Sequence, residues 1–135
     1  MTKRRVAVYK AVFLAAAVYD IVLGIVFTFF YRVPFRWLGI DLPYSNAFVT
    51  LLGSFLLVIG IAYLLIVLGD LRRNRDLILI GALYKAAYSA IAFFHLTVGD
   101  IPHILFALIF GIIDIVFLVV FTECLVHLRR TTKSP

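Results

Sequence analysis

The chain has 135 residues, 64% of them hydrophobic, and a mean hydropathy of +1.11. Soluble domains are roughly 45–50% apolar, so this composition excludes an ordinary soluble domain and indicates a membrane protein. The formal net charge of +6 does not indicate nucleic-acid binding, because the basic residues form short clusters beside apolar runs, a pattern typical of topology signals and anionic headgroup contacts.

The first apolar run covers residues from about 11 to 31, after a basic segment with Lys3, Arg4, Arg5 and Lys10. A run of about 20 apolar residues is long enough to span a bilayer as a helix. A basic start followed by an apolar run and three alanines also resembles a cleaved signal peptide. The run continues well beyond those alanines, which favours an uncleaved first helix.

The longest connection and the second apolar run follow. Residues 32–46 contain Pro34 and Pro43 and several aromatic residues, which favours a short segment lying at the membrane surface. The second run covers residues from about 47 to 69 and carries no charge. Its Gly53 and Gly60 share one helix face, which predicts close packing against another helix.

Two further runs complete the plan. Residues from about 77 to 98 follow an arginine-rich turn, and residues from about 103 to 127 follow a very short turn. In that short turn we expect Asp100 to cap the fourth helix and Pro102 to lie in its first turn. The sequence therefore predicts a single all-α domain over residues 1–135, a polytopic membrane protein with an antiparallel bundle of four transmembrane helices.

The basic residues also predict an orientation. The N-terminal segment, the second turn and the C-terminal tail, which includes Lys133, together hold ten of the 13 Lys and Arg residues. The opposite side has only Arg32 and Arg36. The positive-inside rule then places both termini in the cytoplasm, and the inner (cytoplasmic) membrane is the expected location.

Three charged residues lie inside the apolar runs: Asp20, Lys85 and Asp114. Each such residue costs about 2.5–3.5 kcal/mol at a helix centre and therefore usually faces a partner or a cavity. With a rise of 1.5 Å per residue, Lys85 and Asp20 lie roughly 12 and 14 Å from the predicted arginine-rich side, and Asp114 roughly 20 Å. We therefore expect an Asp–Lys–Asp cluster in the bundle interior. Asp20 and Asp114 also begin two similar segments, DIVLGIVFT and DIVFLVVFT, which supports a similar depth for both.

Two roles for this cluster remain open. Lys85 can bridge the aspartates and fix how the helices pair, or the cluster can bind a ligand or handle a proton. Several tyrosines occur at comparable depths, and their hydroxyls need partners in an apolar interior. The residues expected at the ligand-binding or proton-handling site are Asp20, Lys85, Asp114, Tyr63, Tyr84 and Tyr88.

His95 and His103 flank the short turn between the third and fourth runs and are candidates for a metal or a haem iron, with Asp100 as a third ligand or merely a helix cap. No other ligand pattern accompanies them, so polar residues at the membrane surface are the favoured interpretation. The sequence has no phosphate-binding glycine loop, nucleophile elbow or HExxH motif, so we do not expect an enzyme.

The chain resembles the small bacterial four-helix membrane proteins grouped as DoxX-like. The similarity lies in the four-helix plan and in the segments YDIVLG, LLGSFLLVIGIAYLL and RNRDLILIGALYK. The resemblance implies a link to respiratory or thiol-redox assemblies and to quinones, but it assigns no catalytic residue.

Three functions are compatible with these observations. The first is a binding module that holds a quinone or a lipid in the bundle interior. The second is an accessory subunit whose glycine faces dock a larger, possibly respiratory, membrane complex. The third is a proton-coupled carrier acting as a homo-oligomer. The lipid bilayer is the expected environment in all three.

Overall fold

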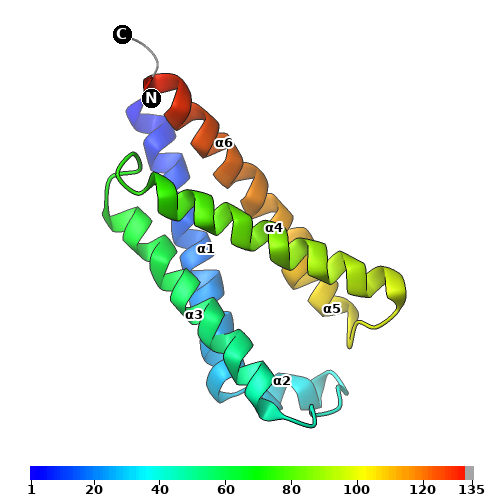
Figure 1. Ribbon diagram of the computed structural model, residues 1–135. Helices are drawn as coiled ribbons and strands as arrows, with labels where there is room; N and C mark the ends of the chain where they lie inside the picture. The colour runs from blue at the N-terminus through cyan, green and yellow to red at the C-terminus, as the bar shows by residue number, and fades with distance from the viewer. Residues whose placement is uncertain (133–135) are drawn as a thin grey trace.

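The computed structural model describes residues 1–132, which form helices joined by short turns (Figure 1). The elements in chain order are α1 (Lys3–Phe29), α2 (Arg32–Trp37), α3 (Asn46–Leu68), α4 (Arg75–Val98), α5 (Ile104–Phe106), the π-helical segment η1 (Ala107–Ile113) and α6 (Asp114–Thr132). The last three elements run on from one another and form the fourth long helix. The predicted all-α architecture with four long helices is confirmed; Lys133 lies outside the described residues.

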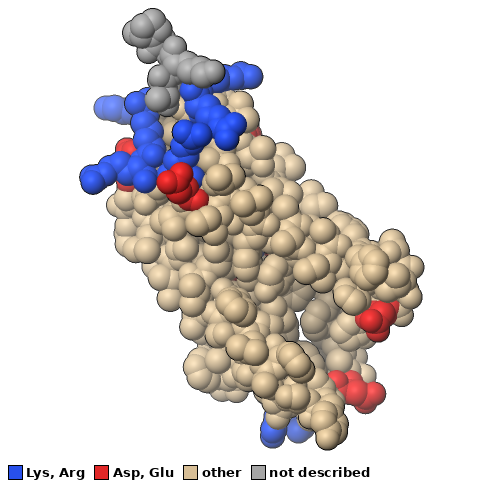
Figure 2. Space-filling model, in the orientation of Figure 1, with Lys and Arg blue, Asp and Glu red and all other residues tan. Residues whose placement is uncertain are grey.

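Each of the four long helices has the length and the apolar composition needed to cross a membrane. Only 28–33% of the residues in the most apolar part of each helix are buried within the chain, and large side chains such as Phe55, Leu83 and Val116 are exposed. Figure 2 shows that Lys and Arg gather at the end that holds both termini, while the long flank of the visible face carries no charge. Such an apolar surface requires lipid around it, so the chain is a multi-pass membrane protein.

Helix α1 begins much earlier than expected, at Lys3 rather than near residue 11. Thr2 caps it, because its Oγ1 accepts a hydrogen bond of 3.4 Å from the Arg5 backbone N–H. Lys and Arg are good helix formers, so the basic segment continues the apolar helix by two turns. The N-terminal basic side chains consequently project from a helix.

The turn before the fourth helix differs from the prediction. Gly99 ends α4 with a φ of 74°, and the Asp100 N–H donates to the His95 carbonyl at 2.9 Å. The cap of the next helix is His103, whose Nδ1 accepts a hydrogen bond of 3.2 Å from the Leu105 N–H. Asp100 is therefore not the cap, and Pro102 precedes the helix. The Asp100 carboxyl group lies beside His95 instead.

The long helices form two pairs (Figure 1). Helix α1 packs along most of α3, and α4 packs along the fourth long helix, with few contacts between the pairs. The pairs lie close together at the end with the termini and diverge toward the opposite end.

The predicted packing role of the α3 glycines is confirmed by the α1–α3 contact. A Cβ on Gly53 would lie 2.5 Å from the Thr28 backbone N, and one on Gly60 would lie 2.8 Å from Ile21 Cγ1. Such distances leave no room for a side chain, so glycine is what allows the two backbones to approach.

The connection between α1 and α3 contains the short helix α2. Its Phe35 is buried, as is the preceding Tyr31, whereas Trp37 is 85% exposed. Phe35 contacts Phe27 of α1 edge-on, with ring centroids 6.3 Å apart. The connection is therefore anchored to the bundle on one side and exposes the Trp37 ring on the other, an arrangement typical of aromatic residues at a membrane surface.

The buried residues form two apolar cores. One lies toward the termini and includes Phe13, Tyr63 and Phe121. The other lies toward the diverging end and includes Phe27 and Phe110. Along α1, α4 and the fourth helix, the three charged residues fall between the members of these two cores.

Candidate functional site

The three intramembrane charges meet, as predicted. Lys85 Nζ lies 2.9 Å from Asp20 Oδ1, 2.8 Å from Asp20 Oδ2 and 2.8 Å from Asp114 Oδ1. The three side chains are 0–1% exposed. Each residue comes from a different long helix, so the ionic cluster (Asp20, Lys85 and Asp114) ties α1, α4 and α6 together.

Hydrogen bonding in the cluster is nearly complete. An ammonium group has three donors, and Lys85 directs its donors to the two aspartates. Both oxygens of Asp20 accept a bond from Lys85. Asp114 Oδ2, however, is buried without a hydrogen-bond partner. Among the side-chain oxygen and nitrogen atoms of the cluster, this oxygen is the one without a hydrogen-bond partner.

Aromatic rings surround the ammonium group. Lys85 Nζ lies 5.4 Å from the ring centroids of Tyr19 and Phe117 and 5.7 Å from that of Tyr63. These distances allow cation–π attraction, which strengthens where water is excluded. Tyr19 and Phe117 were not among the predicted site residues. The spacing of Phe117, three residues after Asp114 and on the same helix face, was a signal that could have identified it.

The π-helical segment η1 leads directly into Asp114. Side-chain hydroxyls from two other helices bind its backbone: Tyr19 Oη donates to the Ile109 carbonyl at 3.0 Å, and Ser89 Oγ donates to the Gly111 carbonyl at 3.2 Å. A π segment carries one extra residue per turn and turns the following residues relative to a regular helix. It therefore sets the direction from which Asp114 enters the cluster.

The three predicted tyrosines divide into two groups. The Tyr63 ring faces Lys85, and its hydroxyl donates to the Gly81 carbonyl at 3.2 Å. Tyr84 and Tyr88 instead pack on each other, with ring centroids 4.4 Å apart, and both are only half-buried. Of the predicted site residues outside the cluster, only Tyr88 lines the pocket between the two helix pairs.

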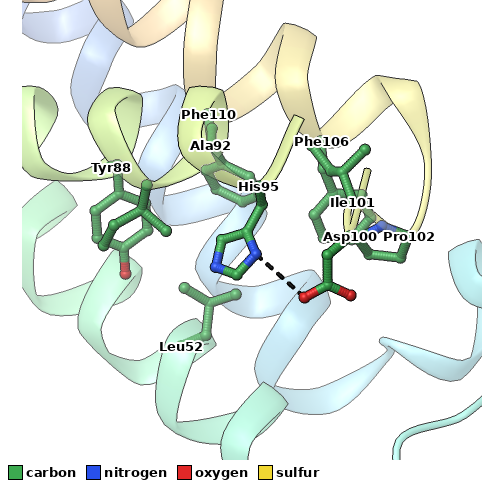
Figure 3. A pocket seen from close by; sticks show the side chains of 10 residues that line it. Leu52, Tyr88, Ala92, His95, Asp100, Ile101, Pro102, Phe106 and Phe110 are labelled. Atoms are coloured by element: carbon green, nitrogen blue, oxygen red, sulfur yellow. Dashed lines mark ion pairs between the residues drawn. The ribbon is translucent and has the colours of Figure 1, made fainter. Parts of the chain in front are cut away.

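That pocket has a volume of about 310 Å³ and lies where the helix pairs diverge (Figure 3). We call it the inter-pair pocket; it is lined by Leu52 of α3, by Tyr88, Ile91, Ala92 and His95 of α4, and by Asp100, Ile101, Pro102, Phe106 and Phe110. Most of this lining is apolar. Figure 2 shows a recess between the helix pairs at the same end of the molecule.

The polar groups of the pocket lie at its rim. His95 Nδ1 is 3.4 Å from Asp100 Oδ2; the His95 side chain is partly exposed and the Asp100 side chain is largely exposed. Tyr88, His95 and Asp100 project toward α3 in Figure 3. His103, the other predicted metal candidate, uses its Nδ1 to cap α5. Within residues 1–132 no group of three or more His, Cys, Asp or Glu side chains is placed to hold a metal ion.

The chain thus combines a sealed ionic cluster with an open apolar pocket that has a polar rim. No protein-family model, no curated protein and no solved structure matches this chain. These two features carry the functional proposals that follow.

Proposed function

We propose that the chain is a small membrane-embedded binding protein that holds an amphipathic molecule in the inter-pair pocket. The observation that carries this proposal is the composition of the pocket, an apolar chamber of about 310 Å³ with the His95–Asp100 pair at its rim. Ligand sites typically measure about 300–1,000 Å³ and combine an apolar wall with a few polar groups that orient the ligand.

The polar rim favours a ligand with one polar end. Asp100 accepts hydrogen bonds, and the imidazole of His95 can donate or accept one. The aromatic wall formed by Tyr88, Phe106 and Phe110 suits a planar ring or a single chain. The pocket volume is at the lower limit for such sites, so it suits a ring with the start of its chain, or part of one acyl chain.

A quinone and a lipid both have this chemistry. The resemblance to DoxX-like proteins favours a quinone, whose carbonyl oxygens accept hydrogen bonds and whose ring matches the aromatic wall. The residues present fit this group, with His95 as a donor at the rim. When bound, a quinone supplies redox chemistry, while the chain's own residues orient its ring and screen it from water.

The experiment that tests this proposal is the identification of molecules that remain bound after gentle detergent extraction. The purified protein is extracted with organic solvent, and quinones and lipids are separated and quantified against the protein. We expect close to one quinone or lipid molecule per chain. Recovery of only bulk phospholipid in the proportions of the membrane would contradict the proposal.

Proton handling at the ionic cluster is a second candidate function, and one oxygen atom of Asp114 favours it. Asp114 Oδ2 is buried without a hydrogen-bond partner, so a proton delivered from outside the cluster can be held at this oxygen. Four helices are few for a carrier, so this function requires an oligomer. A pH-jump measurement on proteoliposomes would test it. The wild-type protein should carry a proton flux that Asp114→Asn loses. Wild-type flux equal to that of protein-free liposomes would reject this function.

The accessory-subunit proposal has less support. The glycine face of α3 was the expected docking surface, but Gly53 and Gly60 are buried against α1 of the same chain. A partner complex would therefore have to use another face. Co-purification of a stoichiometric membrane partner after mild extraction would restore this alternative.

We also propose that the end with the termini faces the cytoplasm of an inner membrane. Most of the described basic residues gather at this end (Figure 2), the pattern that the positive-inside rule associates with the cytoplasmic side. In this orientation the inter-pair pocket lies toward the outer leaflet.

A further inference from the structure

A second hollow lies at the opposite end of the bundle from the inter-pair pocket. It has a volume of about 430 Å³ and lies between the first turns of α1 and the middle of α6. The two helices are adjacent here, since Phe13 and Phe121 stack with ring centroids 4.4 Å apart. We call this hollow the terminal groove; it is lined by residues that include Arg4, Arg5, Val8, Val12, Val120 and Glu123.

The terminal groove is amphipathic along its length. Arg4 and Arg5 lie in the first turn of α1, at the end of the molecule. Val8 and Val12 follow one and two turns further into the helix, and Val120 faces them from α6. The groove therefore presents cationic groups at the level of a lipid headgroup and apolar groups at the level of the first methylene groups.

The single acidic residue of the groove is already engaged. Tyr9 Oη donates to Glu123 Oε1 at 3.0 Å. Arg5 Nη1 lies 3.0 Å from His127 Nε2, and because a guanidinium group can only donate, His127 accepts at this nitrogen. This network fixes Arg5 against α6 and holds Glu123 against α1.

Arg4 differs from Arg5. It is exposed on the rim of the groove, and it makes no ion pair with another residue in the described part of the chain. Lys3, Arg129 and Arg130 are also exposed at this end, where Figure 2 shows the basic side chains gathered. The groove thus has a cation available for an external anion and a positive surrounding field.

From this arrangement we infer that the terminal groove is a binding site for one anionic phospholipid. Its phosphate accepts hydrogen bonds from Arg4 and Arg5, and the beginning of one acyl chain lies along Val8, Val12 and Val120. A free phosphate would use only the cationic rim, so the valine wall is what identifies a lipid as the occupant. This site is independent of the inter-pair pocket and of the ligand proposed there.

The test is a lipid titration of the full-length protein in detergent, followed by native mass spectrometry. Phosphatidylglycerol and phosphatidylcholine with the same acyl chains are compared, and glycerol phosphate tests the headgroup alone. We expect a first phosphatidylglycerol molecule to bind more tightly than phosphatidylcholine, with no detectable binding of glycerol phosphate at the same concentration. Equal binding of the two lipids, or binding of glycerol phosphate as tight as that of the lipid, would overturn the inference.

Charge variants locate the site. An arginine near a membrane surface contributes about 1 kcal/mol to the binding of anionic lipid, so Arg4→Gln should weaken phosphatidylglycerol binding roughly fivefold. Arg72→Gln is the matched control, because Arg72 is exposed in the α3–α4 turn and the variant has the same net charge; we expect less than a twofold change. Glu123→Gln keeps an acceptor for Tyr9 and should strengthen binding. Equal weakening by the two arginine variants would indicate diffuse attraction and reject a built site.

Discussion

Lys85 on α4 donates two hydrogen bonds to Asp20 on α1, of 2.9 Å to Oδ1 and 2.8 Å to Oδ2, across the boundary between the two helix pairs. Contacts between the pairs are otherwise few. Lys85 is also held within its own pair by Asp114 at 2.8 Å. Within residues 1–132, the lysine is therefore a member of one helix pair that also forms a buried ion pair with the other.

Replacing the lysine tests this link. Lys85→Met leaves two buried carboxyl groups without a cation, and removal of one partner from a buried ionic group typically costs about 3–5 kcal/mol. We expect a large decrease in the midpoint of thermal unfolding in detergent and reduced abundance in the membrane. Unchanged fold, abundance and ligand content in Lys85→Met would contradict both a structural and a functional role.

A triple variant separates packing from electrostatics. Asp20→Leu, Lys85→Met and Asp114→Leu together replace the cluster by apolar side chains of similar size, a change that is often neutral or stabilising. We expect the triple variant to recover most of the stability lost in Lys85→Met. A triple variant less stable than Lys85→Met would contradict the view that the instability of Lys85→Met comes from its unpaired buried carboxyl groups.

The glycine contact between α1 and α3 predicts an unusual sensitivity to a single methyl group. In Gly53→Ala the new Cβ would meet the Thr28 backbone, which cannot move without moving the helix. Such overpacking typically costs about 1–3 kcal/mol. Ser54→Ala, at the adjacent exposed position, is the control and should unfold like the wild type. Thermal unfolding of both variants in one detergent distinguishes a tight helix contact from general helix propensity.

The cluster and the helix plan could be predicted because membrane helices obey two simple constraints. A fixed rise per residue gives the depth of each charge, and a charge in an apolar helix needs a partner. Asp20, Lys85 and Asp114 meet for these reasons. The paired segments that begin at Asp20 and Asp114 are consistent with this result, since both aspartates bind the same lysine.

Other features depend on contacts that sequence spacing does not reveal. The helical N-terminal segment was missed because apolarity, rather than helix propensity, was used to place the start of α1. The cap by Asp100 was wrong because His95 lies close enough to bind the same carboxyl group. The π-helical segment was not predicted, since its carbonyls are bound by Tyr19 and Ser89 from other helices. The inter-pair pocket results from the divergence of the helix pairs, which the sequence does not encode locally.

The proposed orientation is tested by cysteine labelling in whole cells. Cys124 is buried and should not react, so single cysteines at exposed positions report the side of the membrane. Asp41 is exposed in the connection between α2 and α3, and Lys3 is exposed near the N-terminus, so Asp41→Cys and Lys3→Cys report on opposite ends of the molecule. We expect an impermeant maleimide to label Asp41→Cys from outside and to label Lys3→Cys only after lysis. The reverse pattern would place the termini outside.

The rim of the inter-pair pocket should affect ligand binding without affecting folding. His95→Phe removes the hydrogen-bonding group but keeps a ring, and a lost hydrogen bond of about 1–1.5 kcal/mol corresponds to roughly a tenfold weaker ligand affinity. His95 is partly exposed, so thermal unfolding without ligand should remain unchanged. Equal ligand retention in wild type and His95→Phe would remove the rim from the proposed site.

The most direct measurement of the central claim is the amount of quinone or lipid retained by two phenylalanine variants of α4. Ala92 is buried in the wall of the inter-pair pocket, so Ala92→Phe should fill the pocket, whereas Ala90 is exposed two residues earlier and Ala90→Phe should leave it open. We predict that a folded Ala92→Phe protein loses the bound molecule and that Ala90→Phe retains it at the wild-type ratio. Equal retention by both variants would contradict a ligand site between the helix pairs.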